Sequence, residues 1–182
     1  DITDPEKVQI VVKNVTPSLF AHLSAVSFIP DSYADLRRTI DINVSGLVNF
    51  LQSIQQINPS CRVLFVSSAD VYGILQSSDR PVRETDPLDL RSPYATSKAS
   101  AELFCDFFVR QYGMSIVIAR PFNHTGPGQS PKFVCSDFAR QIARITHQLQ
   151  DPILYVGNLE NAKDFLDVRD VIDAYAQLLL HP

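Results

Sequence analysis

Tyr94 and Lys98 are the residues whose types and spacing point most directly to chemistry. They follow Ser92-Pro93, a typical helix start, and lie four residues apart, so we expect both side chains on one helix face. An ammonium group beside a phenol favours the phenolate, which lowers a pKa that is about 10 when unperturbed. A tyrosine tuned in this way can pass a proton to or from a substrate oxygen near neutral pH.

Ser68 is a second candidate, because it follows residues 61–67, an apolar run that predicts a buried parallel strand. Ligands bind at the carboxyl ends of strands in open parallel sheets, so Ser68 is placed to hydrogen-bond the same oxygen. Each of these residues alone also has an ordinary structural explanation. The catalytic interpretation is favoured by the order of the pieces: strand, Ser67-Ser68, Val71-Tyr72-Gly73, loop, capped helix, Tyr-x-x-x-Lys, strand, and Arg120-Pro121-Phe122-Asn123.

The elements that must position these residues alternate between helices and strands. Apolar residues recur in steps of three and four from Ala34 to Gln56, which predicts a long amphipathic helix. The other expected elements are helices over 4–14, 92–112, 133–148 and 168–180, and strands over 18–24, 61–67, 115–120 and 153–156, with a loop over 121–131. This alternation predicts an α/β fold, a doubly wound parallel sheet with helices on both faces.

A dinucleotide-binding domain of this kind begins with a strand, a glycine-rich turn and a helix. Neither GxGxxG nor GxxGxxG occurs in the sequence. The chain opens on Asp1 without a strand before its first helix and closes on Pro182 directly after a helix. We therefore expect either a different kind of domain or a Rossmann-like chain truncated at both ends.

Composition narrows the class of protein. The 182 residues are 45% apolar and 20% charged, as in a folded domain. Sixteen basic and twenty acidic residues argue against binding nucleic acid through a basic surface. No apolar stretch approaches the ~20 residues of a membrane span. The cysteines, Cys61, Cys105 and Cys135, are widely spaced and odd in number, which predicts reduced thiols in a cytoplasmic protein and no metal site.

These motifs resemble the extended short-chain dehydrogenase/reductases of the nucleotide-sugar type, the NAD-dependent epimerase/dehydratase family. Residues 119–130 and 157–170 add to the resemblance. It implies NAD(P)(H) as cofactor, a GDP-sugar as substrate, and reduction of the C4 keto group of a GDP-4-keto-6-deoxyhexose. A GDP-mannose 4,6-dehydratase, or another nucleotide-sugar epimerase or dehydratase, is the alternative. A non-catalytic fragment without the cofactor phosphate loop is a second alternative.

The resemblance also implies roles for the candidate residues. Tyr94 is the expected proton donor, Lys98 the residue that holds the nicotinamide ribose and lowers the pKa of Tyr94, and Ser68 the group that polarises the C4 carbonyl. Asp70 falls where the dehydratases carry a glutamate base, and the shorter aspartate favours reduction. Asn43 resembles a helix asparagine that supports the active site.

Further positions match binding residues of the family. Expected cofactor contacts, besides Tyr94 and Lys98, are Asp1, Ile2, Leu23, Ser24, Ala25, Arg38, Pro121, Phe122 and His124. Expected substrate contacts, besides Ser68 and Asp70, are Asn123, Phe133, Val134, Arg140 and Lys163. Lys163 stands where relatives usually carry an arginine, and a lysine binds phosphate as a point charge without the bidentate geometry.

The resemblance finally implies how the chain is divided and assembled. Residues 1–130 are expected to be the carboxyl part of the dinucleotide-binding domain with the catalytic residues, and 131–182 the start of the substrate-binding region. A homodimer is expected through the helices over 34–56 and 92–112. Three aromatic residues of the second helix suit such an interface, and at least one of them packs on its own subunit: Phe104, Phe107 and Phe108.

Overall fold

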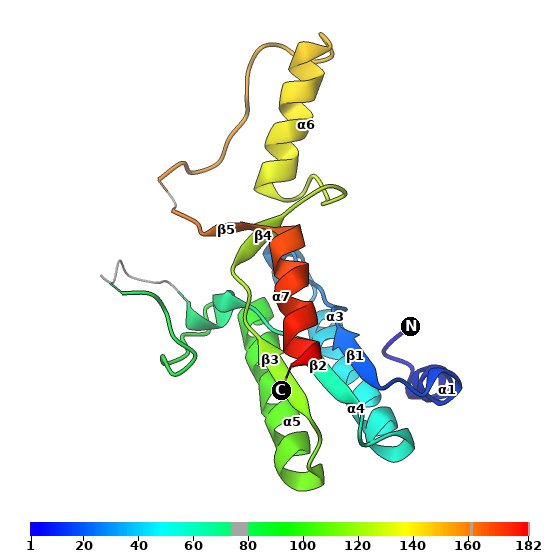
Figure 1. Ribbon diagram of the computed structural model, residues 1–182. Coiled ribbons are helices and arrows are strands. Elements are labelled where there is room, and N and C mark those ends of the chain that lie inside the picture. The colour runs from blue at the N-terminus through cyan, green and yellow to red at the C-terminus, as the bar shows by residue number, and fades with distance from the viewer. Residues whose placement is uncertain (74–79, 161, 182) are drawn as a thin grey trace. The chain divides into compact units, whose positions relative to one another are not determined.

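The computed structural model describes residues 1–73, 80–160 and 162–181, in which helices and strands alternate (Figure 1). The helices are α1 (Pro5–Val15), α2 (Ile29–Ala34), α3 (Leu36–Ile40), α4 (Gly46–Ile57), α5 (Pro93–Tyr112), α6 (Val134–Thr146) and α7 (Val168–Leu180), with a π-helical turn η1 (Asp41–Ser45) and a 3-10 turn η2 (Ala69–Tyr72). The strands are β1 (Leu19–His22), β2 (Arg62–Val66), β3 (Ile116–Ala119), β4 (Asn123–Thr125) and β5 (Phe165–Asp167). The chain forms two compact units, Asp1–Pro121 with the residues from Ala174 onward, and Phe122–Asp173.

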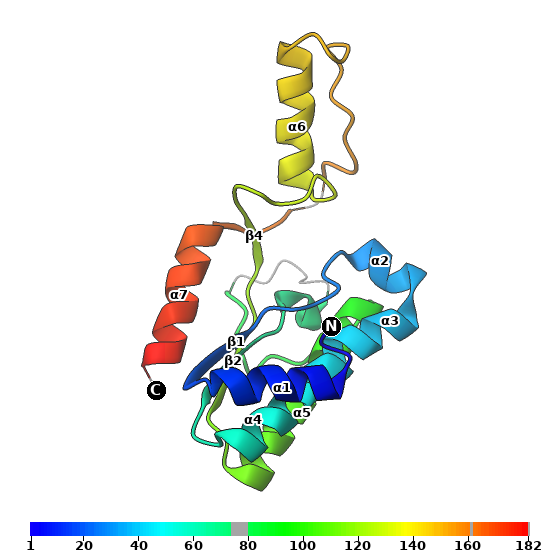
Figure 2. The ribbon, with the colours of Figure 1, turned by 90° about the vertical axis from the view of Figure 1, so that its right-hand side faces the viewer.

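The first unit is built on a parallel sheet in the order β1-β2-β3. Helices α1, α4 and α5 cover one face, and the end of α7 lies on the other (Figure 2). Arg62 of β2 fastens that end of α7, because its Nη2 donates to the carbonyl oxygens of Leu178 and His181, each at 2.9 Å. The predicted α/β fold with a parallel sheet is confirmed.

Local sequence signals set the ends of the helix that carries Tyr94. Ser92 caps α5, because its Oγ accepts a hydrogen bond from the amide of Ala95 at 3.0 Å, and Pro93 occupies the first turn. Gly113 ends the helix in the left-handed conformation, at φ 66°. Both ends lie where the sequence predicts them.

The helix predicted over 34–56 is present but not uniform. It runs from Leu36 to Ile57 as α3, η1 and α4 without a break, and α2, which was not predicted, precedes it. A π-helical turn inserts an extra residue into a helix and is frequent at functional sites. Here it contains Asn43, so the irregularity coincides with a residue singled out from the sequence.

In the second unit, β4 pairs in parallel with β5, from Asn123 opposite Phe165 to Thr125 opposite Asp167. Both short strands were missed, and β4 falls inside the expected loop. The strand predicted over 153–156 is wrong, because these residues form no strand. The backbone of Tyr155 is hydrogen-bonded by a side chain instead: Gln141 accepts from the amide of Tyr155 at 2.8 Å and donates to its carbonyl at 2.9 Å. The expected functional division after residue 130 stays a prediction.

In the described part of the chain, none of the helices combines the length and the apolar character that a bilayer crossing demands. The three cysteines are free thiols in this structure. Cys61 and Cys105 are buried, and Cys135 is half-buried.

His22 ends β1 inside the core of the first unit, with only 2% of its surface exposed. Its ring lies among those of Phe20, Phe50 and Phe65, with centroids 5.8 to 6.1 Å away. Its Nε2 has no hydrogen-bond partner among the described residues. Burial, together with the charge of Lys98, lowers the pKa of His22 to about 4.

We predict that His22 makes the protein sensitive to acid. The pKa falls from 6.5 to about 4 on folding, so the unfolded chain binds this proton more tightly. The resulting stability is complete above pH 6.5 and is lost as the pH falls towards 4. Between pH 7 and 4.5, urea unfolding of the wild type should lose about 2–3 kcal/mol more than unfolding of a His22→Leu variant. His147→Leu, at an exposed position, serves as the control; equal losses in all three proteins would refute the prediction.

Candidate active site

The turn after β2 places Ser68 at the carboxyl edge of the sheet. Ser68 caps η2, because its Oγ accepts a hydrogen bond from the amide of Asp70 at 3.2 Å, and its side chain also hydrogen-bonds Tyr94. Gly73 closes the turn at φ 69°, and a Cβ there would lie 2.4 Å from the carbonyl oxygen of Asp89. The Val-Tyr-Gly motif therefore needs its glycine in order to hold this turn against the following loop.

Tyr94 lies in the first turn of α5 with 8% of its surface exposed. Burial raises its pKa to about 12, the hydrogen bond from Ser68 opposes the rise, and the charge of Asp70 adds to it. The expected lowering by Lys98 is therefore wrong for this structure. Lys98 has a pKa of about 8, so it is already neutral at the high pH where Tyr94 loses its proton.

Lys98 lies one helical turn after Tyr94 and is 3% exposed. Its Nζ donates to the carbonyl oxygen of Val66 at 2.6 Å, and lies 5.1 Å from the ring centroid of Phe65 and 5.9 Å from that of Tyr94. Burial lowers its pKa to about 8. At neutral pH the site thus contains a largely protonated lysine beside a protonated tyrosine.

Asn43 ties α5 to the loop after β1. It is 1% exposed, its Nδ2 donates to Ser97 Oγ at 2.9 Å and to the carbonyl of Val26 at 3.2 Å, and its Oδ1 accepts from the amide of Val26 at 2.7 Å. Ser97 is the neighbour of Lys98 on α5. These contacts support the role that the resemblance implies for Asn43.

Several of the expected cofactor residues belong to the first unit. Leu23, Ser24 and Ala25 directly follow β1, and Leu23 is 63% exposed. Ile2 packs on Gly46, where a Cβ would approach Ile2 Cδ1 to 2.6 Å. Pro121 accepts a hydrogen bond from the amide beside Ser68, that of Ala69, at 2.9 Å.

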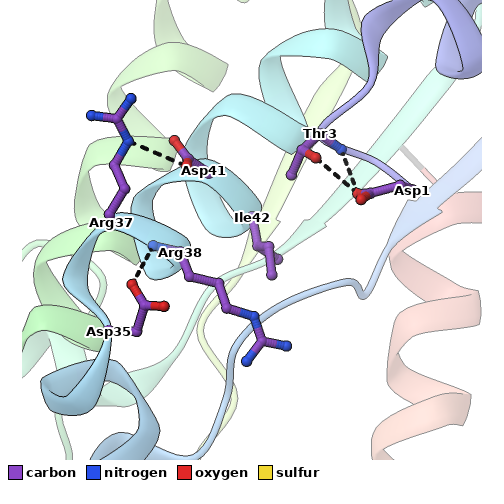
Figure 3. A pocket seen from close by; sticks show the side chains of 7 residues that line it. All are labelled: Asp1, Thr3, Asp35, Arg37, Arg38, Asp41 and Ile42. Atoms are coloured by element: carbon purple, nitrogen blue, oxygen red, sulfur yellow. Dashed lines mark hydrogen bonds and ion pairs between the residues drawn. The ribbon is translucent and has the colours of Figure 1, made fainter.

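Asp1 and Arg38 line one hollow of about 350 Å³ (Figure 3). Its other lining residues are Thr3, Asp35, Arg37, Asp41 and Ile42. Arg37 pairs with Asp41 at 3.3 Å, whereas no bond joins the guanidinium of Arg38 to the other residues drawn. The structure therefore brings together two predicted cofactor residues that are 37 positions apart in the sequence.

The second unit contains the remaining predicted residues. His124 Nδ1 lies 3.0 Å from the carbonyl oxygen of Phe122, and Asn123 Nδ2 donates to the carbonyl of Asp164 at 3.3 Å. These bonds brace the β4–β5 pair, and the expected contacts of these residues with ligands stay predictions.

The predicted substrate residues near α6 differ in their exposure and in the contacts that they make. Phe133 precedes the helix and Val134 begins it, with 48% of Val134 exposed. Arg140 pairs with Asp137 on the same helix at 2.7 Å, so this carboxylate competes with any phosphate for the guanidinium. Lys163 is exposed in the segment before β5.

The sequence interpretation missed a polar network beside Lys98. Glu102, 7% exposed, makes a bidentate ion pair with Arg120 at 2.6 and 2.9 Å, and Arg120 also donates to the hydroxyl of Tyr72 at 2.8 Å. One signal was available, because Glu102 follows Tyr94 by eight residues and Lys98 by four, which is the same helix face.

The fold, a parallel α/β sheet with Ser68, Tyr94 and Lys98 at its carboxyl edge, defines the class as a Rossmann-like domain. The family model described as GDP-mannose 4,6 dehydratase matches residues 1–182, and the chain belongs to this family. GDP-6-deoxy-D-mannose reductase of Pseudomonas aeruginosa is 41% identical over 165 residues, which cover 91% of this chain and 54% of that protein.

Two further comparisons agree with this family. GDP-mannose 4,6-dehydratase of Yersinia enterocolitica is 30% identical over 174 residues, 94% of this chain and 46% of that protein. The structure of RMD from Pseudomonas aeruginosa complexed with NADPH matches with a TM-score of 0.94 and 39% identity, over 100% of this chain and 61% of that chain. The chain thus spans about half the length of the curated relatives it matches.

We predict that Asn43 supports the edge of the sheet energetically. Asn43→Ala removes three hydrogen bonds and leaves the backbone of Val26 without them, so the free energy of unfolding should fall by about 2–4 kcal/mol. The amide of Val26 should also lose protection from hydrogen exchange. Asn58→Ala, which removes one bond to the carbonyl of Pro17, is the matched control and should cost about 1 kcal/mol. Equal costs, with Val26 still protected, would contradict this role.

Proposed function

We propose that this chain carries the catalytic residues of an NAD(P)H-dependent nucleotide-sugar reductase, which reduces the C4 keto group of a GDP-4-keto-6-deoxyhexose. The observation that carries the proposal is the meeting of Ser68, Tyr94 and Lys98 at one edge of the sheet. The 41% identity to a GDP-6-deoxy-D-mannose reductase supports the reductase over the dehydratase, whose relative is 30% identical.

The protonation state of Tyr94 also favours reduction. A pKa raised to about 12 leaves the phenol protonated at neutral pH, which is the form that donates a proton to the oxygen at C4. Ser68, hydrogen-bonded to Tyr94, is placed to orient the same oxygen. A bound nicotinamide supplies the hydride that C4 receives.

The residues of the first unit fit a dinucleotide cofactor. The hollow that contains Asp1 and the guanidinium of Arg38 suits the adenosine part, with Ile2 beside it, and Lys98 suits the nicotinamide ribose. Residues that complete the cofactor site in this proposal are Leu23, Ser24, Ala25, Tyr94, Pro121, Phe122 and His124. Residues proposed for the substrate are Ser68, Asp70, Asn123, Phe133, Val134, Arg140 and Lys163.

A GDP-mannose 4,6-dehydratase is the second candidate. The observation in its favour is the carboxylate of Asp70, which is close enough to Tyr94 to raise its pKa and lies where the dehydratases carry a base. The lower identity of the dehydratase relative, 30% against 41% for the reductase, ranks this candidate second.

We also propose a homodimer through α3, α4 and α5. The outward face of α5 carries Leu103, Phe104 and Phe107, which are 71%, 42% and 49% exposed, and the neighbouring α3 exposes Leu36 and Ile40. Phe108, by contrast, is 4% exposed and belongs to the core of its own subunit. Exposed apolar side chains on neighbouring helices are typical of a subunit interface. We place the protein in the cytoplasm, which its free thiols fit.

The reductase is tested with the enzyme expressed from its complete coding sequence, GDP-4-keto-6-deoxymannose and NADPH. The wild type should oxidise NADPH, and Tyr94→Phe should lower the rate by about 10²–10⁴-fold, because the proton donor is lost. Tyr112→Phe, on the same helix but 46% exposed, should retain the wild-type rate. Conversion of GDP-mannose to a 4-keto product without net NADPH consumption would establish the dehydratase instead. No turnover of either substrate would indicate that the protein is not catalytic.

The dimer is tested by sedimentation velocity at micromolar concentration. The wild type should sediment as a dimer, and a double variant, Leu103→Glu with Phe107→Glu, should sediment as a monomer because two charges enter the apolar face. Leu159→Glu, equally exposed but in the second unit, should remain dimeric. A monodisperse wild-type monomer would refute the proposal.

A further inference from the structure

Arg120 directly follows β3, and its guanidinium group joins two elements that carry proposed catalytic residues. On one side it pairs with Glu102 of α5, Nε to Oε1 at 2.9 Å and Nη2 to Oε2 at 2.6 Å. On the other side its Nη1 donates to the hydroxyl of Tyr72, the last residue of η2, at 2.8 Å. Because α5 carries Tyr94 and η2 is capped by Ser68, a single side chain links the two elements.

The link is largely shielded from water. The side chains of Arg120 and Glu102 are 20% and 8% exposed, and Tyr72 is 7% exposed. The guanidinium also lies 5.1 Å from the ring centroid of Tyr72 and donates to the carbonyl oxygen of Glu84 at 3.1 Å, which brings it to four hydrogen bonds. A buried ion pair contributes little net stability, because desolvation offsets much of its attraction. The number and directions of these bonds point instead to a role in geometry.

The backbone next to Arg120 holds the same turn. The carbonyl oxygen of Pro121 accepts a hydrogen bond from the amide of Ala69, the residue after Ser68, at 2.9 Å. Ala69 begins η2 and Tyr72 ends it, so both ends of the turn are bonded to two consecutive residues of the chain. A shift of the turn relative to α5 would therefore stretch or break these bonds.

We propose that Arg120 and Tyr72 are positioning residues of the active site, which set the place of the Ser68 hydroxyl relative to Tyr94. The proposal rests on the proposed function in taking Ser68 and Tyr94 as the groups that act on the C4 oxygen. Both positioning residues act through the turn and not on the reacting atoms. A lysine in place of Arg120 would balance the charge of Glu102, but it lacks the fork geometry that bonds two elements at once.

The first measurement follows the turn without substrate or cofactor, in the enzyme expressed from its complete coding sequence. Tyr72→Phe removes only the hydroxyl that accepts from Arg120 and leaves the ion pair in place. Hydrogen–deuterium exchange of the amides of residues 69–73 should become about 3–10-fold faster, because a bond that holds the turn closed is lost. Exchange over β2 should stay as in the wild type. Tyr33→Phe, which loses a hydroxyl bond to the carbonyl of Arg91 at 3.0 Å, is the matched control and should leave the turn unchanged.

The second measurement follows NADPH oxidation with GDP-4-keto-6-deoxymannose. Tyr72→Phe should lower kcat by about 10-fold and Arg120→Lys by about 10²-fold, with KM within about twofold of the wild type, because a displaced catalytic group slows the chemical step more than binding. When Ser68 is already replaced, in Ser68→Ala, the same changes should have little further effect, because no hydroxyl remains to be misplaced. Single-turnover experiments at high enzyme concentration keep the slow variants measurable. A merely structural role would lower the rate by the same factor with and without Ser68.

The two measurements separate this inference from the reductase itself. If the wild type does not oxidise NADPH but the turn exchanges faster in Tyr72→Phe, the proposed reaction is wrong and the role of Arg120 in holding the turn stands. If the enzyme is an active reductase and the loss of rate in Tyr72→Phe persists in the Ser68→Ala background, the proposal is overturned. Unchanged exchange over the turn in Tyr72→Phe would overturn it as well. If Arg120→Lys fails to fold, Tyr72→Phe decides the question alone.

Discussion

A lysine ammonium group enclosed in the protein interior is the constraint on which the first unit depends. Lys98 is 3% exposed, and a charge removed from water is costly unless fixed groups replace its hydration. The carbonyl of Val66 at the end of β2 and the ring of Phe65 provide part of that replacement. The helix that carries Lys98 can therefore take few positions relative to β2. The position of Tyr94 is fixed in the same way, since it lies one turn away on the same rigid helix.

A second buried group fixes the same helix from the other side. Asn43 uses its amide to hold Ser97 and both backbone groups of Val26, so α5 and the loop after β1 share one anchor. The π-helical turn presents this asparagine without ending the long helix around it. Lys98 and Asn43 together make the carboxyl edge of the sheet rigid, which is what proton transfer at a defined position requires.

The features that were predicted correctly depend on residues close together in the sequence, whereas those that were missed depend on residues far apart in it. The ends of α5 follow from Ser92, Pro93 and Gly113, which act within one turn of themselves, and a single sequence suffices to identify them. The failed strand over 153–156 was decided by Gln141, which supplies hydrogen bonds from another element. Glu102 was missed for the same reason, because its partner Arg120 lies 18 residues away, directly after β3. Spacing along the sequence predicted that Ser68, Tyr94 and Lys98 share one site, but burial decided the pKa values of Tyr94 and Lys98.

The raised pKa of Tyr94 and the charge of Lys98 both contribute to the proton transfer in the proposed reduction. In an equilibrium titration Lys98 loses its proton near pH 8 and Tyr94 near 12, so the phenolate forms beside a neutral amine and gains nothing from it. In the proposed reduction at neutral pH, Tyr94 gives up its proton while Lys98 is still charged. The phenolate then forms beside an ammonium group, and the attraction that is absent from the titration appears as the proton is transferred. Burial keeps Tyr94 protonated before the reaction, and the charge of Lys98 stabilises the phenolate that the proton transfer leaves.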